Sequence, residues 1–89
     1  MELTLLVLFA SWCPKCHMML PVVDDLEAEF AADWNVVRID IEKHPEMIEK
    51  YDVQIVPTFV LIKGGEQVGR MAGMIGEETL RSRLKGHMK

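Results

Sequence analysis

Residues 3–9 of the chain are almost continuously apolar and rich in β-forming side chains. Such a run is typical of a central strand that is covered on both faces. From Pro14 to Ala32, apolar residues recur at helical spacing, with acidic residues elsewhere around the helix surface. We therefore expect a helix over this range. Pro14 suits its first turn, where a backbone N–H would have no partner, and Pro21 is expected to kink it.

The remaining pattern completes an α/β fold. Residues 35–41 are expected to form a second strand, which the preceding helix joins to the first as a right-handed parallel crossover. The order strand, helix, strand, helix, strand, strand, helix predicts a four-stranded mixed sheet with helices on both faces. The later elements are a short helix, two strands joined around a Gly64-Gly65-Glu66 hairpin, and a final helix: Pro45–Tyr51, Thr58–Ile62, Gln67–Met71 and Glu77–Gly86.

The composition indicates a folded protein with one domain, spanning residues 1–89. A chain of 89 residues is too short to divide into domains, and its 49% of apolar residues can fill one core. The net charge of -4 argues against nucleic acid as a partner, because phosphate binding needs a basic face. Cations gather near the C-terminus, where we expect a solvated helix end, with a docking patch as the alternative: Arg81, Arg83, Lys85 and Lys89.

The apolar run at the start of the chain is too short to cross a membrane. It covers Leu3–Ala10, whereas a membrane-spanning helix needs about 20 such residues. It also lacks the preceding positive charge and the following small-residue cleavage site of a secretory signal. We therefore expect a cytoplasmic protein with no membrane partner, in a compartment where structural disulfides are rare.

The chain has two cysteines, Cys13 and Cys16, and they stand at the expected start of the first helix. Residues three apart on a helical turn lie about 5–6 Å apart on one face, a separation that suits both a dithiol and a disulfide. Free N–H groups and the positive end of the helix dipole favour the thiolate at Cys13. This spacing predicts a redox pair, with Cys13 as the attacking nucleophile and Cys16 as the resolving thiol.

Two other interpretations of the pair remain at this stage. Free cysteines pack readily as small apolar residues, so both thiols could be inert parts of the core. A zinc site needs further ligands, and His17, His44 and His87 do not stand at a spacing that would complete one. We therefore expect no metal.

The segment Trp12-Cys13-Pro14-Lys15-Cys16 resembles the active-site motif of the thioredoxin and glutaredoxin family. The resemblance implies a minimal thioredoxin fold, thiol–disulfide oxidoreductase activity, and no cofactor beyond the redox-active disulfide itself. It covers nearly the whole chain and includes the kinking proline, the segment with the family's cis-proline, the hairpin, and a glycine lining the substrate groove: Pro21, Asp52–Phe59, Gly64-Gly65-Glu66 and Gly73.

The resemblance also implies how a substrate is held. Pro57 should follow a cis peptide bond and face the cysteines, and Val56 should offer its backbone to an extended peptide. Trp12, Val56 and Met74 would form an apolar rim around Cys13. Core filling is the alternative for Met74.

Three departures from the family pattern alter these expectations. The strand and helix that precede the motif in full-length thioredoxins are absent, so the strand at 35–41 should be a sheet edge, although we expect a monomer. Val7 occupies the place of a buried aspartate, and Arg38 that of a lysine. We therefore expect Cys16 to stay protonated to higher pH than in typical thioredoxins. Lys15, if more than a surface lysine, should favour the Cys13 thiolate and make the couple more oxidising.

The leading hypothesis is a cytoplasmic reductase of protein disulfides that an external reductase, similar to thioredoxin reductase, recycles. A glutaredoxin-like enzyme recycled by glutathione is the nearest alternative. A non-catalytic adaptor with a thioredoxin fold is a third.

Overall fold

The computed structural model describes residues 3–31 and 34–87. Within them, strands and helices follow one another in the order expected from the sequence. The elements are β1 (Leu3–Phe9), α1 (Pro14–Glu29), β2 (Trp34–Asp40), α2 (Glu46–Lys50), β3 (Thr58–Lys63), β4 (Glu66–Ala72) and α3 (Glu77–His87).

The four strands form one mixed sheet in the order β2-β1-β3-β4. β1 runs parallel to β2, with Leu3 opposite Trp34 and Phe9 opposite Asp40. β1 pairs antiparallel with β3, and β3 with β4. The strand β2 is an edge of the sheet, as expected. Because β1 and β2 end side by side, the segments that follow them meet at one end of the molecule.

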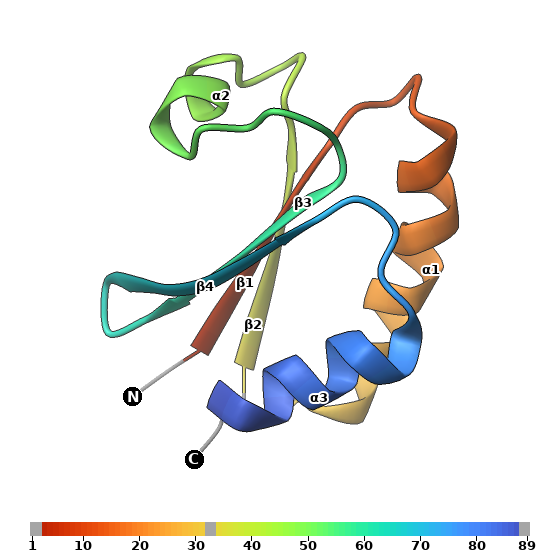
Figure 1. Ribbon diagram of the computed structural model, residues 1–89, viewed down its shortest axis with the longest axis vertical. Helices are drawn as coiled ribbons and strands as arrows, with labels where there is room; N and C mark the ends of the chain where they lie inside the picture. Colours follow the sequence, from red (N-terminus) through yellow and green to blue (C-terminus); the bar gives the residue numbers. More distant parts are fainter. Residues whose placement is uncertain (1–2, 32–33, 88–89) are drawn as a thin grey trace.

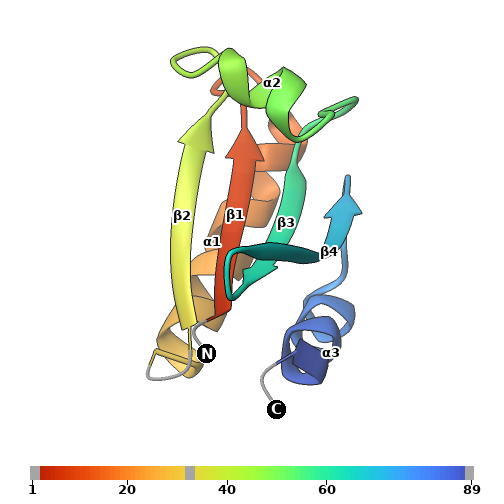
Figure 2. The ribbon, with the colours of Figure 1, turned by 90° about the vertical axis from the view of Figure 1, so that its left-hand side faces the viewer.

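Helices cover both faces of the sheet. Figure 1 shows α1 and α3 on one face and α2 on the other, and Figure 2 shows α2 lying across the end of the strands. The larger core lies between the sheet and the pair α1 and α3, and the smaller one lies beneath α2. The buried β1 residues alternate between the two cores, with Leu5 and Val7 in the first and Leu6 and Leu8 in the second. This accounts for the continuous apolar run.

Most expected boundaries are confirmed within one or two residues. The first helix ends at Glu29, earlier than predicted, because Phe30 leaves the helical conformation and its ring packs edge-on against Trp34 at 6.2 Å. Ala32, the predicted end, lies outside the described residues. The hairpin turn contains only Gly64 and Gly65, both with positive φ, and Glu66 already belongs to β4.

Within the described part of the chain, none of the helices combines the length and the apolar character needed to span a membrane.

Candidate active site

The two cysteines lie where β1 ends and α1 begins. Cys13 is the N-cap residue of α1, and Pro14 occupies the first turn of the helix. The Cys13 sulfur accepts a hydrogen bond from the backbone N–H of Cys16 at 3.4 Å, as a serine or aspartate oxygen does at many helix starts. Both residues are free cysteines, with 5% and 1% of their surfaces exposed. The expected position of the pair at a helix N-terminus is confirmed.

Opposing effects act on the Cys13 thiol. Burial raises its pKa, but hydrogen bonds from the Cys16 thiol and from the backbone N–H groups of Cys16 and Lys15 lower it, and so does the charge of Lys15. The lowering effects prevail, so the pKa of Cys13 lies below its usual value. A thiol of this kind is ionised over a wider pH range and is a nucleophile.

The Cys16 thiol is shifted in the other direction. Burial raises its pKa to about 11, the hydrogen bond and negative charge of Cys13 add to the rise, and a backbone hydrogen bond from Ala10 opposes it. The main cause of the rise is burial, and the comparison with typical thioredoxins stays a prediction. The environments thus push the two pKa values apart.

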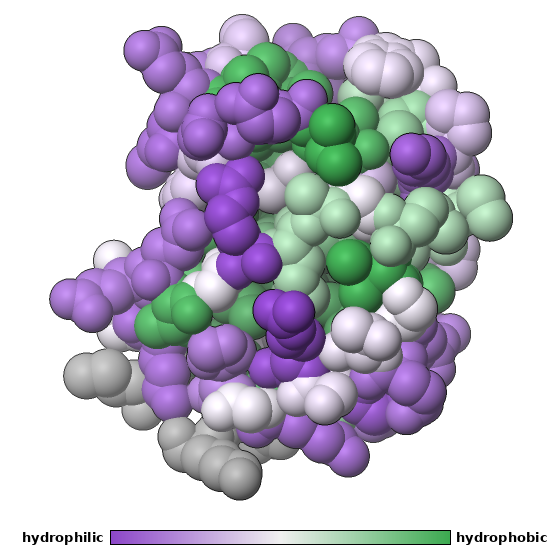
Figure 3. All heavy atoms as spheres, in the orientation of Figure 1, coloured by the Kyte–Doolittle hydropathy of each residue, from purple (hydrophilic) through white to green (hydrophobic). Residues whose placement is uncertain are grey.

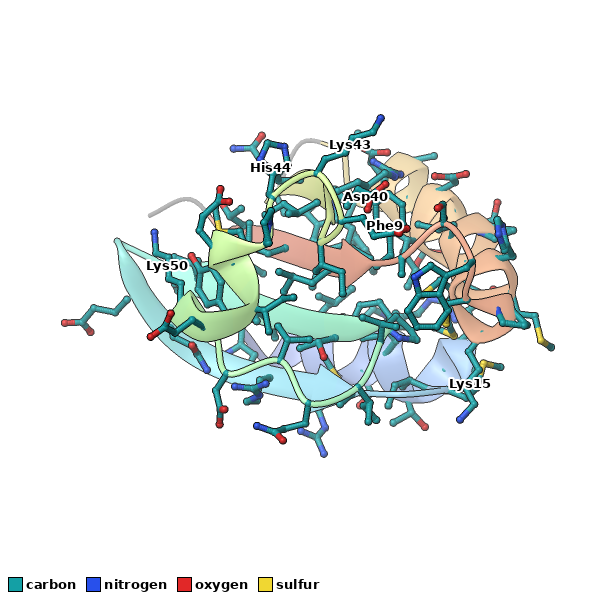
Figure 4. The ribbon with its side chains drawn as sticks, turned by 90° about the horizontal axis from the view of Figure 1, so that it is seen from above. Phe9, Lys15, Asp40, Lys43, His44 and Lys50 are labelled. Atoms are coloured by element: carbon teal, nitrogen blue, oxygen red, sulfur yellow. The ribbon has the colours of Figure 1, made fainter. Side chains whose placement is uncertain are left out.

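Lys15 points outward from the first turn of α1 (Figure 4). It acts on Cys13 through its backbone N–H and through its charge, and both effects lower the pKa of that thiol. The charge of Lys15 is the weakest of the effects on Cys13, so its role in tuning the thiol stays a prediction.

A loop from the far side of the sheet reaches the cysteines. The Cys13 thiol donates a hydrogen bond to the carbonyl oxygen of Val56, at a sulfur–oxygen distance of 3.6 Å. The peptide bond between Val56 and Pro57 is cis, as the resemblance implied. Thr58 holds the loop by donating to the carbonyl of Ile55 at 2.7 Å, and Gly73 N–H donates to the Pro57 carbonyl at 2.8 Å. Gly73 has a φ of 81°, which explains the glycine at this position.

An apolar pocket of about 230 Å³ adjoins the cysteines. Figure 3 shows hydrophobic surface gathered between α2 and the start of α1. Val56 belongs both to the pocket and to the cluster that packs against Cys13 and Cys16, so the two are continuous. The pocket is lined by Trp12, Ile41, Ile48, Val53, Gln54, Ile55 and Val56.

The structure brings most of the predicted rim together. Trp12, with 66% of its surface exposed, and Val56 share the pocket. Met74 is 48% exposed, so core filling is wrong for this residue, but it does not line the pocket. Met74 follows Gly73, whose backbone N–H donates a hydrogen bond to the Pro57 carbonyl.

Sequence reasoning missed the apolar residues that come to the pocket from α2 and its flanks. Ile48 on α2 and Ile55 in the following loop are 38% and 52% exposed, and because only the structure shows this exposure, the sequence held no clear signal for them. It also missed Arg70 on β4, which donates to the carbonyls of Tyr51 and Asp52 at 2.7 and 3.0 Å. Arg70 therefore holds the start of the loop that leads to Val56.

Two other features lie away from the cysteines. Arg38 pairs with Asp24 and, at 2.9 Å, with Glu27 on α1, so it fastens the helix to the edge strand. A larger hollow of about 540 Å³ runs along α3; Arg83 of the alternative docking patch lines it, whereas the residues predicted around the cysteines do not. Among the described residues, no three histidine, cysteine, aspartate or glutamate side chains gather in a way that could hold a metal ion.

Comparison with known proteins agrees with this geometry. A family model described as Thioredoxin matches residues 1–86. The chain belongs to the thioredoxin family. The thioredoxin of Synechocystis sp. is 33% identical over 88 residues, which are 98% of this chain and 82% of the relative. Members of this family are thiol–disulfide oxidoreductases, and this chain is a thiol–disulfide oxidoreductase as well.

Solved thioredoxin structures share the fold over nearly the whole chain. The germline-specific thioredoxin Deadhead of Drosophila melanogaster has a TM-score of 0.91 at 29% identity, covering 97% of this chain and 81% of its own. Thioredoxin NaTrxh of Nicotiana alata has a TM-score of 0.92 at 31% identity, covering 99% of this chain and 75% of its own. The predicted four-stranded thioredoxin fold is confirmed.

Proposed function

We propose that this thioredoxin reduces disulfide bonds in proteins, with Cys13 as the nucleophile and Cys16 as the resolving thiol. The observation that supports this most strongly is the N-cap position of Cys13. Its sulfur accepts the N–H of Cys16 while its pKa is lowered, and the pKa of Cys16 is raised to about 11. The Cys13 sulfur is thus available as the attacking thiolate, and the Cys16 thiol keeps its proton until the mixed disulfide has formed.

The reaction has two exchange steps. The Cys13 thiolate attacks one sulfur of the substrate disulfide, forming a mixed disulfide and releasing the other substrate sulfur as a thiolate, which takes up a proton. The Cys16 thiol then loses its proton and attacks the Cys13 sulfur, and the second substrate sulfur leaves and is protonated. The substrate gains two electrons and two protons, and Cys13 and Cys16 end as a disulfide.

The substrate chain would lie extended beside Val56 and pair with its backbone, in the manner of an added strand. Trp12 and the pocket wall beneath it would receive an apolar side chain of the substrate. Gly73, buried next to Pro57, would let the substrate backbone approach closely, and exposed Met74 would adapt to different sequences.

A decisive test compares the wild type with single cysteine variants. Reduced wild-type protein should make insulin precipitate in the presence of dithiothreitol, and Cys13→Ser should abolish this. Cys16→Ser should instead accumulate a covalent adduct with a substrate protein, detectable by mass spectrometry. Ser82→Ala, on the exposed side of α3, is the matched control and should behave as wild type. An inactive wild type would favour the adaptor hypothesis.

The electron donor is tested separately. We propose an external protein reductase, supported by the similarity to thioredoxins along almost the whole chain. Recycling by thioredoxin reductase with NADPH should exceed recycling by glutathione. The opposite result would assign the chain to glutathione-dependent enzymes.

We also propose that the protein is a cytoplasmic monomer that needs no metal or organic cofactor. Its two cysteines form the redox pair, which leaves none for the structural disulfides typical of secreted domains. Cell fractionation, sedimentation of the purified protein and metal analysis of an anaerobic preparation would test these three points.

A further inference from the structure

The turn at Ser11 and Trp12 joins β1 to α1 and places Trp12 on the surface. The N–H of Cys13 closes it by donating to the Ala10 carbonyl at 3.2 Å. The Trp12 side chain is 66% exposed and forms one wall of the apolar pocket. Because little of the Trp12 side chain is buried, its position depends mainly on the backbone conformation of the turn.

Two side chains from outside the turn hold it in place. The Nε2 atom of His17, on α1, lies 2.7 Å from the carbonyl oxygen of Ser11. Since a carbonyl only accepts, the ring must present an N–H there, which both the charged ring and one neutral tautomer can do. The hydroxyl of Ser11 donates to a carboxylate oxygen of Glu42 at 2.9 Å, and the N–H of Glu42 donates to Asp40 at 2.9 Å. The turn is thus fastened to α1 on one side and to the end of β2 on the other.

We propose that His17 and Glu42 are positioning residues for protein substrates, acting through Trp12. Their hydrogen bonds keep the turn in the conformation that makes Trp12 a pocket wall, so that a polypeptide can seat an apolar side chain beside its disulfide. This inference rests on the proposed function. Small disulfides need no such seat, because the hydrogen bonds between Cys13 and Cys16 and between Cys13 and Val56 do not involve the Ser11 or Trp12 side chain.

The test compares two substrates: a peptide disulfide with an aromatic residue beside its cysteine, and hydroxyethyl disulfide. His17→Ala and Ser11→Ala should each lower kcat/KM for the peptide by about three- to tenfold, mainly through KM, as expected for one lost hydrogen bond. The rate with hydroxyethyl disulfide should change by less than about twofold. Ser11→Thr, which keeps the hydroxyl donor, and His17→Gln, which keeps an N–H donor, should recover most of the peptide activity.

A double-variant experiment tests whether His17 acts through Trp12. In a Trp12→Ala background, adding His17→Ala should have almost no further effect on kcat/KM for the peptide. His44→Ala and Ser82→Ala are matched controls, since these residues are exposed and make no bond to the turn, and both should behave as wild type.

Several outcomes would overturn the inference. Equal losses with both disulfides, unchanged activity in His17→Ala and Ser11→Ala, or an undiminished His17→Ala effect without Trp12 would each contradict it. Failure of the proposed function would appear differently, as a wild-type protein that reduces neither disulfide.

Discussion

The carbonyl oxygen of Val56 accepts a hydrogen bond from the Cys13 thiol at 3.6 Å, although the two residues are 43 positions apart. The bond lasts only while Cys13 is protonated, because a thiolate has no hydrogen to donate. Ionisation of Cys13 therefore breaks this contact, and under the proposed function the freed Val56 carbonyl would accept a backbone N–H from a substrate chain. Activation of the sulfur and exposure of the backbone acceptor are thus linked in one contact.

The first prediction concerns the ionisation of Cys13. Cys16→Ala and Lys15→Gln should both raise the pKa of Cys13, the former more, because the hydrogen bond from the Cys16 thiol lowers it most and the Lys15 charge least. The rate of alkylation of Cys13 by iodoacetamide as a function of pH measures this value. Below the pKa the rate falls as the thiolate is protonated, so each variant should lose reactivity at a higher pH than the wild type.

Lys43→Gln is the control for charge alone, since Lys43 is another exposed lysine that has no part in the shift of Cys13. If Lys15→Gln and Lys43→Gln gave the same pH profile as wild type, Lys15 would be only a surface residue.

The second prediction concerns Cys16. In Cys13→Ser, the pKa of Cys16 should fall from about 11 yet stay above that of an ordinary thiol, because burial is the largest cause of the shift and it remains. Ultraviolet titration of the thiolate measures it. A raised pKa also means that the contribution of Cys16 to stability is present below its unfolded-state pKa and is lost as the pH rises through about 11. A normal or low pKa of Cys16 in Cys13→Ser would show that burial does not raise the pKa of this thiol.

The third prediction concerns Val7, which is completely buried against α1 at the position where the resemblance implied an aspartate. Val7→Asp should lower the free energy of unfolding by about 3 kcal/mol or more in neutral buffer, because the carboxylate would be buried and the cation opposite it on β2, Arg38, is already paired with Asp24 and Glu27. The loss of stability should be smaller in mildly acidic buffer, where the introduced carboxyl group is protonated and neutral. It should then be similar to the loss caused by Val7→Asn. Urea denaturation at both pH values measures it, with Val37→Asp on the exposed edge strand as control. A loss independent of pH would contradict the prediction.

The fourth prediction compares two glycines. Gly73→Ala should destabilise the protein by about 1–2 kcal/mol, because its φ of 81° is unfavourable for any residue with a Cβ atom. It should also weaken peptide reduction, since the N–H of Gly73 holds the Pro57 carbonyl. Gly86→Ala, inside α3 with no atom within 4 Å of the added Cβ, should stabilise the protein by about 0.5–1 kcal/mol. Thermal denaturation of both variants measures these changes, and a stabilised Gly73→Ala would refute the backbone argument.

The sequence predictions are accurate where a feature depends on neighbouring residues, and they fail where it depends on contacts between separate segments. β1 was predicted with both boundaries right, because an uninterrupted apolar run is produced by burial on both faces. The end of α1 was predicted too late, because periodicity continues to Phe30 while that ring packs against Trp34 in the structure. The contacts of His17, Arg38 and Arg70 could not be predicted, because each joins a side chain to a backbone carbonyl or a side chain of another segment.

The sequence by itself determined that two cysteines stand one helical turn apart at the start of a helix, after a buried strand and before a long amphipathic segment. These features depend on neighbouring residues, which local patterns record. Only the tertiary structure decided how the two thiols differ. Burial of Cys16, the approach of Val56 to Cys13 and the pocket under Trp12 all result from packing between distant segments. Ionisation responds to the surroundings in space, and a linear pattern does not contain them.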